Sequence, residues 1–114
     1  MLPRIKKLEF RHAHIDDQIY TDNDIFLHSN GHEATNPSKI FTQEDFAKML
    51  LHDPQTIIFG TGFKDKVEIE RSVFDSAKKL NIELVMMPTS EAAKKFHEYS
   101  RQGRKTIAKL HITC

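Results

Sequence analysis

The chain of 114 residues has the length of one ordinary domain, so we expect a single domain spanning residues 1–114 with one core. Its 17 basic and 16 acidic residues nearly balance, which leaves no long-range field to attract nucleic acid or an anionic membrane. The apolar runs are too short for a membrane helix or for the core of a signal peptide. We therefore expect a soluble, cytoplasmic protein with no nucleic-acid binding and no membrane insertion.

Short strands are predicted for the N-terminal part of the chain. Apolar runs at 5–10, 18–20 and 24–28 are separated by turn residues, which is typical of β-strands. We expect the runs at 18–20 and 24–28 to pair as a β-hairpin. The following segment, 30–39, is polar and contains Gly and Pro, and it is predicted to be a surface loop.

A short helix is predicted after this loop. Thr42 has the residue type and position of an N-cap, and Asp45 stands at the distance that a capping box requires. Phe46, Met49 and Leu50 have the i, i+3, i+4 spacing of an apolar helix face. Pro54 and the residue before it end the helix.

Beyond Pro54 the pattern is strand, helix, strand, helix, strand. Continuous apolar runs at 56–60 and 82–87 are typical of strands that are covered on both faces. The helix between them is predicted to start at Asp65, with Glu68 completing a capping box. Two strands joined by one amphipathic helix form a βαβ unit, which predicts a parallel pair.

The last helix and strand complete this half of the chain. Thr89 or Ser90 is predicted to cap the helix, and Gly103 to stop it. Residues 106–114 then read as a closing strand. Together the elements predict an α/β fold: a single three-layer domain with a mixed, partly parallel central sheet, an N-terminal β-hairpin and a C-terminal βαβαβ-like half.

Two segments carry a resemblance, TIIFGTG at 56–62 and MMPTSEAAKKFHEYSRQGRKTIAKLHITC at 86–114. They resemble a family of small α/β domains that includes an adipogenesis-associated protein and a mitochondrial complex I assembly factor. The resemblance covers residues 54–114 and implies a mixed sheet, with regulatory or assembly roles in some eukaryotic members. It carries over no catalytic residue. Unlike many family members, this chain has no Trp in the loop before its first helix.

Two glycines directly after a buried strand form the candidate ligand site. They let the backbone turn sharply and are expected to place the N–H groups of residues 61–64 near the start of the next helix, where the helix dipole favours anions. Asp65 stands where a dinucleotide fingerprint has its third Gly, so an NAD site is not expected. We predict first a strand-exit turn and second a shallow pocket for a small anion or a partner's carboxylate. The predicted ligand-binding residues are Gly60, Thr61, Gly62, Phe63 and Lys64.

Other side chains give no metal, cofactor or catalytic motif in the sequence. The seven histidines are not accompanied by a Cys pair or by His-Glu-x-x-His, so no metal site and no cofactor are predicted. Cys114, close in sequence to His111, is interpreted as a strand-end residue and not as a nucleophile. Thr113 and Ser90 show no arrangement with His and Asp that the sequence reveals, so no catalytic residue is predicted.

Two functional hypotheses follow. The first is a non-catalytic binding, assembly or regulatory module that acts through a protein partner. The second is an enzyme or sensor for a small anionic ligand bound at the strand ends near residues 60–64, where open α/β sheets favour ligands. The sequence leaves open whether the protein is an enzyme and favours the first hypothesis.

Overall fold

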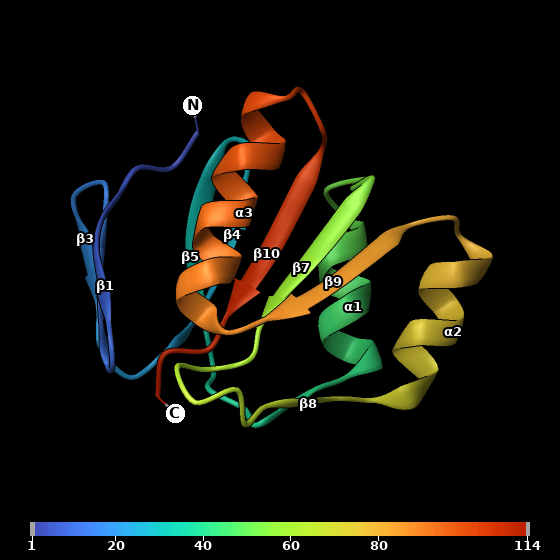
Figure 1. The fold of residues 1–114 in the computed structure, drawn as a ribbon, viewed down its shortest axis with the longest axis horizontal. Coiled ribbons are helices and arrows are strands. Elements are labelled where there is room, and N and C mark those ends of the chain that lie inside the picture. The colour runs from blue at the N-terminus through green and yellow to red at the C-terminus, as the bar shows by residue number, and fades with distance from the viewer. Residues whose placement is uncertain (1, 114) are drawn as a thin grey trace.

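A five-stranded mixed sheet forms the centre of the molecule, in the order β5-β4-β10-β7-β9 (Figure 1). The computed structural model describes residues 2–113. Three strands run parallel, β7 (Thr56–Gly60), β9 (Glu83–Met87) and β10 (Thr106–Leu110). Two antiparallel strands continue the sheet from β10, β4 (Asp24–His28) and then β5 (Gly31–Thr35). The predicted α/β class with a mixed, partly parallel sheet is confirmed.

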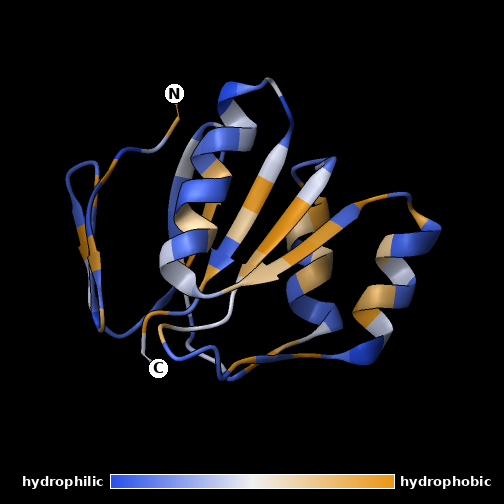
Figure 2. Ribbon diagram, viewed as in Figure 1, coloured by the Kyte–Doolittle hydropathy of each residue, from blue (hydrophilic) through white to orange (hydrophobic). Residues whose placement is uncertain are grey.

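Helices cover both faces of this sheet, which gives the three predicted layers. The helix α3 (Thr89–Arg101) packs on β7 and β10 on one face. The helices α1 (Gln43–Leu50) and α2 (Arg71–Lys79) contribute to the core on the other face. Figure 2 shows that the central strands between these layers are largely apolar, as strands covered on both faces require. Within residues 2–113, the helices are too short and too polar to cross a membrane.

A second, antiparallel sheet lies at the N-terminal side of the molecule. It consists of β1 (Ile5–Glu9), β2 (His12–Ile15) and β3 (Gln18–Tyr20), in that order. Its residues Ala13 and Tyr20 share a core cluster with α3 and the central sheet. Antiparallel N-terminal strands are therefore present, as the fold class predicted.

The predicted pairing of 18–20 with 24–28 is wrong. β3 pairs with β2, whereas β4 pairs with β10 and β5, so the two runs belong to different sheets. The physical reason is burial. β4 has buried residues on both faces and needs the interior of the large sheet, while the residues Gln18 and Ile19 of β3 are exposed.

The segment predicted to be a surface loop, 30–39, contains β5 instead. This strand forms one edge of the central sheet and is partly exposed, which gives it the polar composition of a loop. A polar network joins it to the N-terminal sheet: the hydroxyl of Tyr20 lies 2.7 Å from Nδ1 of His32, and Nε2 of His32 lies 3.1 Å from Oδ2 of Asp16. The edge strand is thus fastened by side chains as well as by its ladder.

The capping box of α1 is confirmed. The Thr42 side chain accepts a hydrogen bond from the Asp45 amide, and the Asp45 carboxylate accepts one from the Thr42 amide. Of the three residues predicted for its apolar face, Phe46 and Met49 are buried, and Leu50 is half-buried and packs against the same core cluster.

The predicted start of α2 is wrong. Asp65 lies in a turn with a φ of 56°, and the helix begins at Arg71 after Glu70 in the N-cap position. The residues between form β8 (Glu68–Ile69), which pairs in parallel with β6 (Ile40–Phe41). A sequence signature of a capping box was therefore overridden by strand pairing with a distant segment.

The last helix is also capped differently from the prediction. Pro88 occupies the N-cap position, and Thr89 is the first helical residue. The Thr89 hydroxyl does not cap its own helix but donates to the His111 carbonyl at 2.6 Å. Gly103 follows the helix with a φ of 81°, in agreement with its predicted role as the stop.

Candidate functional site at the strand ends

The turn after β7 is held from within the protein. The Thr61 amide donates to the Met87 carbonyl at 2.9 Å, and the Gly62 amide donates to the Thr89 hydroxyl at 2.9 Å. Gly62 has a φ of 96°, a conformation that favours glycine. Two of the amides predicted to face an anion are therefore used by the fold itself.

Gly60 allows α3 to approach the sheet closely. A Cβ atom at this position would lie 2.9 Å from a methyl group of Leu110 and 3.2 Å from the backbone Cα of Thr89. Thr61 is fully buried, and its hydroxyl bonds the Asp65 carboxylate. These contacts agree with the predicted strand-exit role of the turn.

The other two predicted site residues lie at the surface side of the turn. Phe63 is half-buried and packs against the core cluster beneath α3, while Lys64 is exposed. The start of α2 is remote from them in sequence, because that helix begins only at Arg71. The prediction that the N-terminus of α2 lies near residues 61–64 and attracts an anion to them is therefore wrong. The anion pocket at residues 60–64 stays a prediction.

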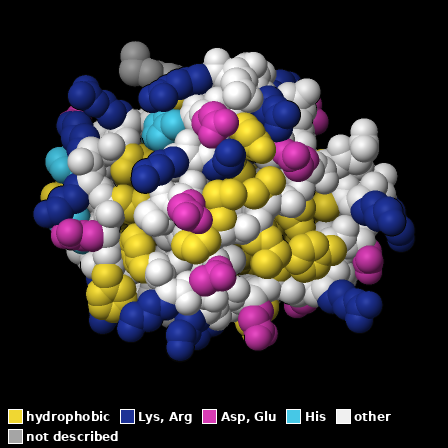
Figure 3. Space-filling view, in the orientation of Figure 1, with side chains coloured by type: hydrophobic (Ala, Val, Ile, Leu, Met, Phe, Trp, Pro, Cys, Tyr) yellow, Lys and Arg dark blue, Asp and Glu magenta, His cyan; other side chains and the backbone are white. Residues whose placement is uncertain are grey.

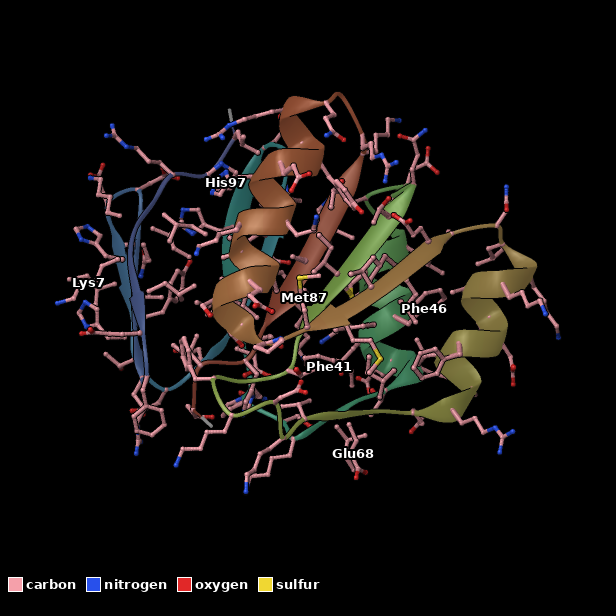
Figure 4. All side chains as sticks on the ribbon, in the orientation of Figure 1. Lys7, Phe41, Phe46, Glu68, Met87 and His97 are labelled. Atoms are coloured by element: carbon pink, nitrogen blue, oxygen red, sulfur yellow. The ribbon has the colours of Figure 1, made fainter. Side chains whose placement is uncertain are left out.

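A charge cluster centred on the buried residues Lys109 and Asp24 lies beside this turn and was not foreseen from the sequence. The Lys109 ammonium lies 3.5 Å from the Asp24 carboxylate and 3.1 Å from that of Asp45. It also lies over the Phe41 ring, 4.7 Å from the ring centroid. Figure 4 places Phe41 and Met87 at this end of the sheet. Lys109 and Asp24 are 1 % and 0 % exposed, so the two charges are excluded from water and depend on each other.

His111 links the charge cluster to the turn. Its amide donates to the Gly60 carbonyl at 3.1 Å, and its carbonyl accepts the Thr89 hydroxyl. Its side chain points to the cluster, with Nδ1 2.7 Å from Oδ1 of Asp24. Its Nε2 lies 3.2 Å from the Thr113 hydroxyl. The structure therefore assembles a hydroxyl, an imidazole and a carboxylate that the sequence did not show to be neighbours.

The Asp24 carboxylate is the centre of this arrangement. Burial raises its pKa above the ordinary value of 3.8, and the charges of His111 and Lys109 act in the opposite direction. The Ser38 amide also donates to its Oδ2 at 3.1 Å. A cavity of about 170 Å³ borders His111. It is lined by Pro37, Ser38, Lys39, His111 and Thr113.

One sequence signal for the cluster existed. A strand buried on both faces normally carries apolar residues, yet β10 and its extension place Lys109 and His111 on one face. Such residues need buried partners, but the sequence does not say that Asp24 supplies the carboxylate. Cys114 lies outside the described residues. Among residues 2–113, no group of three His, Cys, Asp or Glu side chains is placed to hold a metal ion.

Two stacked histidines, His28 and His52, lie at the other end of β4 from Asp24. The rings of His28 and His52 are 4.3 Å apart at an angle of 21° and line a cavity of about 210 Å³. Burial, and next the charge of His52, lower the pKa of His28 below its ordinary value of 6.5. The stacked arrangement therefore favours the neutral form of His28.

This pair should make stability fall on acidification. Since the pKa of His28 is lower in the folded than in the unfolded protein, its contribution is complete above about pH 6.5 and is lost as the pH falls through the folded value. We expect His28→Phe, which keeps a ring but does not titrate, to weaken the pH dependence of the free energy of unfolding. Urea unfolding of both proteins at pH 7.5 and pH 5 measures this difference. An equal loss of stability in both proteins would contradict it.

A third feature is the apolar edge of the sheet at β9. This strand ends the sheet order, and on its outer side no further strand lies within the described part of the chain. Met86 and the neighbouring Phe74 of α2 are 49 % and 40 % exposed. Figure 3 shows a continuous apolar patch over this part of the surface. Beside it a cavity of about 590 Å³ runs between β9 and α2.

Comparison with known proteins identifies the family of this chain. Residues 5–111 match a family model described as a protein of unknown function (DUF498/DUF598). No curated protein matches the chain.

Solved structures match over nearly the whole chain. The conserved hypothetical protein PH1505 from Pyrococcus horikoshii has a TM-score of 0.82 and 22 % identity, covering 97 % of this chain and 99 % of its own. XCC1710 from Xanthomonas campestris has a TM-score of 0.84 and 17 % identity, with 99 % and 86 % covered. An Mth938-like domain from Bordetella pertussis has a TM-score of 0.73 and 12 % identity, with 98 % and 87 % covered.

Proposed function

Because the chain belongs to the DUF498/DUF598 family, we propose that it is a binding module that takes up an extended segment of a partner protein along β9. The family includes the adipogenesis-associated protein and a mitochondrial complex I assembly factor, and an assembly role in one member supports a binding role here. The observation that carries the proposal is the apolar, uncovered edge strand β9.

The two edges of the central sheet differ in a way that supports this choice. β5 carries His32 and Glu33, and its side chains bond the N-terminal sheet. Charged and fastened edges of this kind resist strand addition. In β9 the four residues after Glu83 are apolar, so this edge lacks that protection. Its backbone suits β-strand addition. In this mode, the backbone hydrogen bonds to the added strand give affinity, and the adjoining side-chain pockets give specificity.

The cavity beside β9 indicates what kind of segment fits. Its apolar part includes Phe74 of α2 and Leu84 of β9. Its charged part has Lys78 and Arg104 against the single acid Glu83, which already pairs with Arg104 at 3.0 Å. A partner strand with apolar residues at alternate positions and one acidic residue near Lys78 complements this surface.

Photo-crosslinking in the native host tests the proposal. A photoreactive phenylalanine analogue is placed at Met86, and a matched control carries it at Ile19, which is 55 % exposed on the N-terminal sheet. We expect one polypeptide to be crosslinked from position 86 and not from position 19. The crosslinked peptide should have alternating apolar residues.

A charge variant measures how much the β9 edge contributes to binding. Met86→Lys should leave the melting temperature close to that of the parent, because the side chain is half exposed, but should reduce binding of the crosslinked peptide at least about tenfold. No crosslink from position 86, or equal crosslinking from both positions, would refute docking at β9.

The second candidate is the small-anion site at Gly60, Thr61, Gly62, Phe63 and Lys64. Proximity of the turn to the first residue of α3, through the bond from Gly62 to Thr89, favours it. NMR spectra of isotopically labelled protein, titrated with phosphate, sulfate and NAD, report on the backbone amides of these residues. Saturable shifts at residues 60–66 with phosphate or sulfate would support the second candidate, and their absence would leave the turn with its structural role.

A further inference from the structure

We propose that Thr113, His111 and Asp24 form an acyl-accepting site in which the Thr113 hydroxyl attacks small activated esters. This activity goes beyond partner docking, and its site lies at the ends of β4 and β10, which β7 separates from β9 in the sheet. Its chemical class is acyl transfer from an ester to a hydroxyl, with hydrolysis of the resulting ester.

The geometry is that of an activated hydroxyl. The Thr113 Oγ1 lies 3.2 Å from Nε2 of His111, and Nδ1 of the same ring lies 2.7 Å from Oδ1 of Asp24. When Nδ1–H donates to the carboxylate, Nε2 carries the lone pair that accepts the hydroxyl proton. A nucleophile and a base within hydrogen-bond reach, with the base oriented by a third group, are the signature of nucleophilic catalysis.

Asp24 is fixed as an orienting group should be. Its second oxygen, Oδ2, accepts the Ser38 amide at 3.1 Å and lies 3.5 Å from the Lys109 ammonium. Lys109 is held in turn by Asp45 at 3.1 Å. These contacts leave Oδ1 directed at His111 and favour the ionised carboxylate, which stabilises an imidazolium during proton transfer.

The cavity beside the Thr113 hydroxyl indicates which substrates reach it. Thr113 is half-buried and lines the same cavity as the imidazole, with Lys39 on its rim. A volume of about 170 Å³ admits an acetyl-sized group beside the hydroxyl. Small esters with a good leaving group are therefore the expected substrates.

The proposed step balances in atoms and charge. The Thr113 oxygen forms a bond to the carbonyl carbon while its proton passes to Nε2 of His111. The bond between the carbonyl carbon and the leaving oxygen then breaks, and His111 returns the proton to the departing alcohol. Water repeats the sequence, which releases the carboxylic acid and restores the Thr113 hydroxyl.

Treatment with p-nitrophenyl acetate tests the site. All proteins carry Cys114→Ser, so that the thiol does not compete for the acetyl group. We expect peptide mapping by mass spectrometry to find an acetyl group on Thr113. Thr113→Val should abolish this label, Thr113→Ser should keep it on Ser, and His111→Gln should slow its formation at least about 100-fold.

Controls separate chemistry from folding. Thr113→Val has nearly the same shape as the parent side chain, so an unchanged melting curve shows that a lost label reflects lost chemistry. Lys105→Ala removes only an exposed ion pair with Asp53 and should acetylate Thr113 at the parent rate. Acetyl groups confined to amines, or labelling of Thr113 at the parent rate in folded His111→Gln, would overturn the proposal.

Discussion

Deletion of residues 106–114 is expected to abolish cooperative unfolding. These residues include β10, whose five residues are all buried and which pairs with both β4 and β7 in the middle of the sheet. Its loss exposes two strands and both core clusters, and the total stability of a small domain is only about 5 to 15 kcal/mol. Thermal melting followed by circular dichroism measures the effect.

The matched control for this deletion is a protein that lacks residues 113 and 114 and keeps β10. It should melt cooperatively near the midpoint of the parent, because the sheet is intact. A protein without residues 106–114 that still melts cooperatively near that midpoint would show that β10 is dispensable.

Lys109→Ala is expected to lower the free energy of unfolding by about 3 to 5 kcal/mol. The substitution leaves Asp24 fully buried without its ammonium partner and deprives Asp45 of the same contact. It also removes the ammonium group that lies 5.8 Å and 4.7 Å from the ring centroids of Phe26 and Phe41. Chemical denaturation at neutral pH measures the loss.

Lys105→Ala is the matched control on the same strand region. Its ion pair with Asp53 is exposed, with an N–O distance of 3.6 Å, and exposed pairs contribute about 0 to 1 kcal/mol. The double variant Asp24→Asn, Lys109→Met should recover part of the loss, since no charge is then left unpaired at Asp24. A change below about 0.5 kcal/mol for Lys109→Ala would mean that the cluster does not stabilise the fold.

Local signals predicted much of the fold because they act over a few residues. The capping box at Thr42 and Asp45 needs no distant partner, and the apolar runs of β7 and β9 report burial directly. The same local signature at Asp65 failed. There β8 pairs with β6, and this pairing determines where α2 begins. The pairing of β3 and β4 failed for a related reason, since adjacency in sequence does not fix which sheet a strand joins.

The candidate site was predicted less well because its residues are far apart in sequence. The bond between Asp24 and His111 spans 87 residues, and no spacing rule connects them. The turn residues 60–64 were found because glycines after an apolar run are a local signal. The sequence did not show that the Thr89 hydroxyl and the His111 carbonyl complete the surroundings of this turn.

The place of β10 in the middle of the sheet has a consequence for how the protein is made. Synthesis proceeds from the N-terminus, so β4 and β7 leave the ribosome before the strand that joins them exists. Until residues 106–110 have emerged, both strands present unpaired backbone edges and apolar faces to solvent or to chaperones. The sheet is therefore completed late, and nascent chains that stall before residue 106 are the ones most exposed to aggregation and to proteolysis.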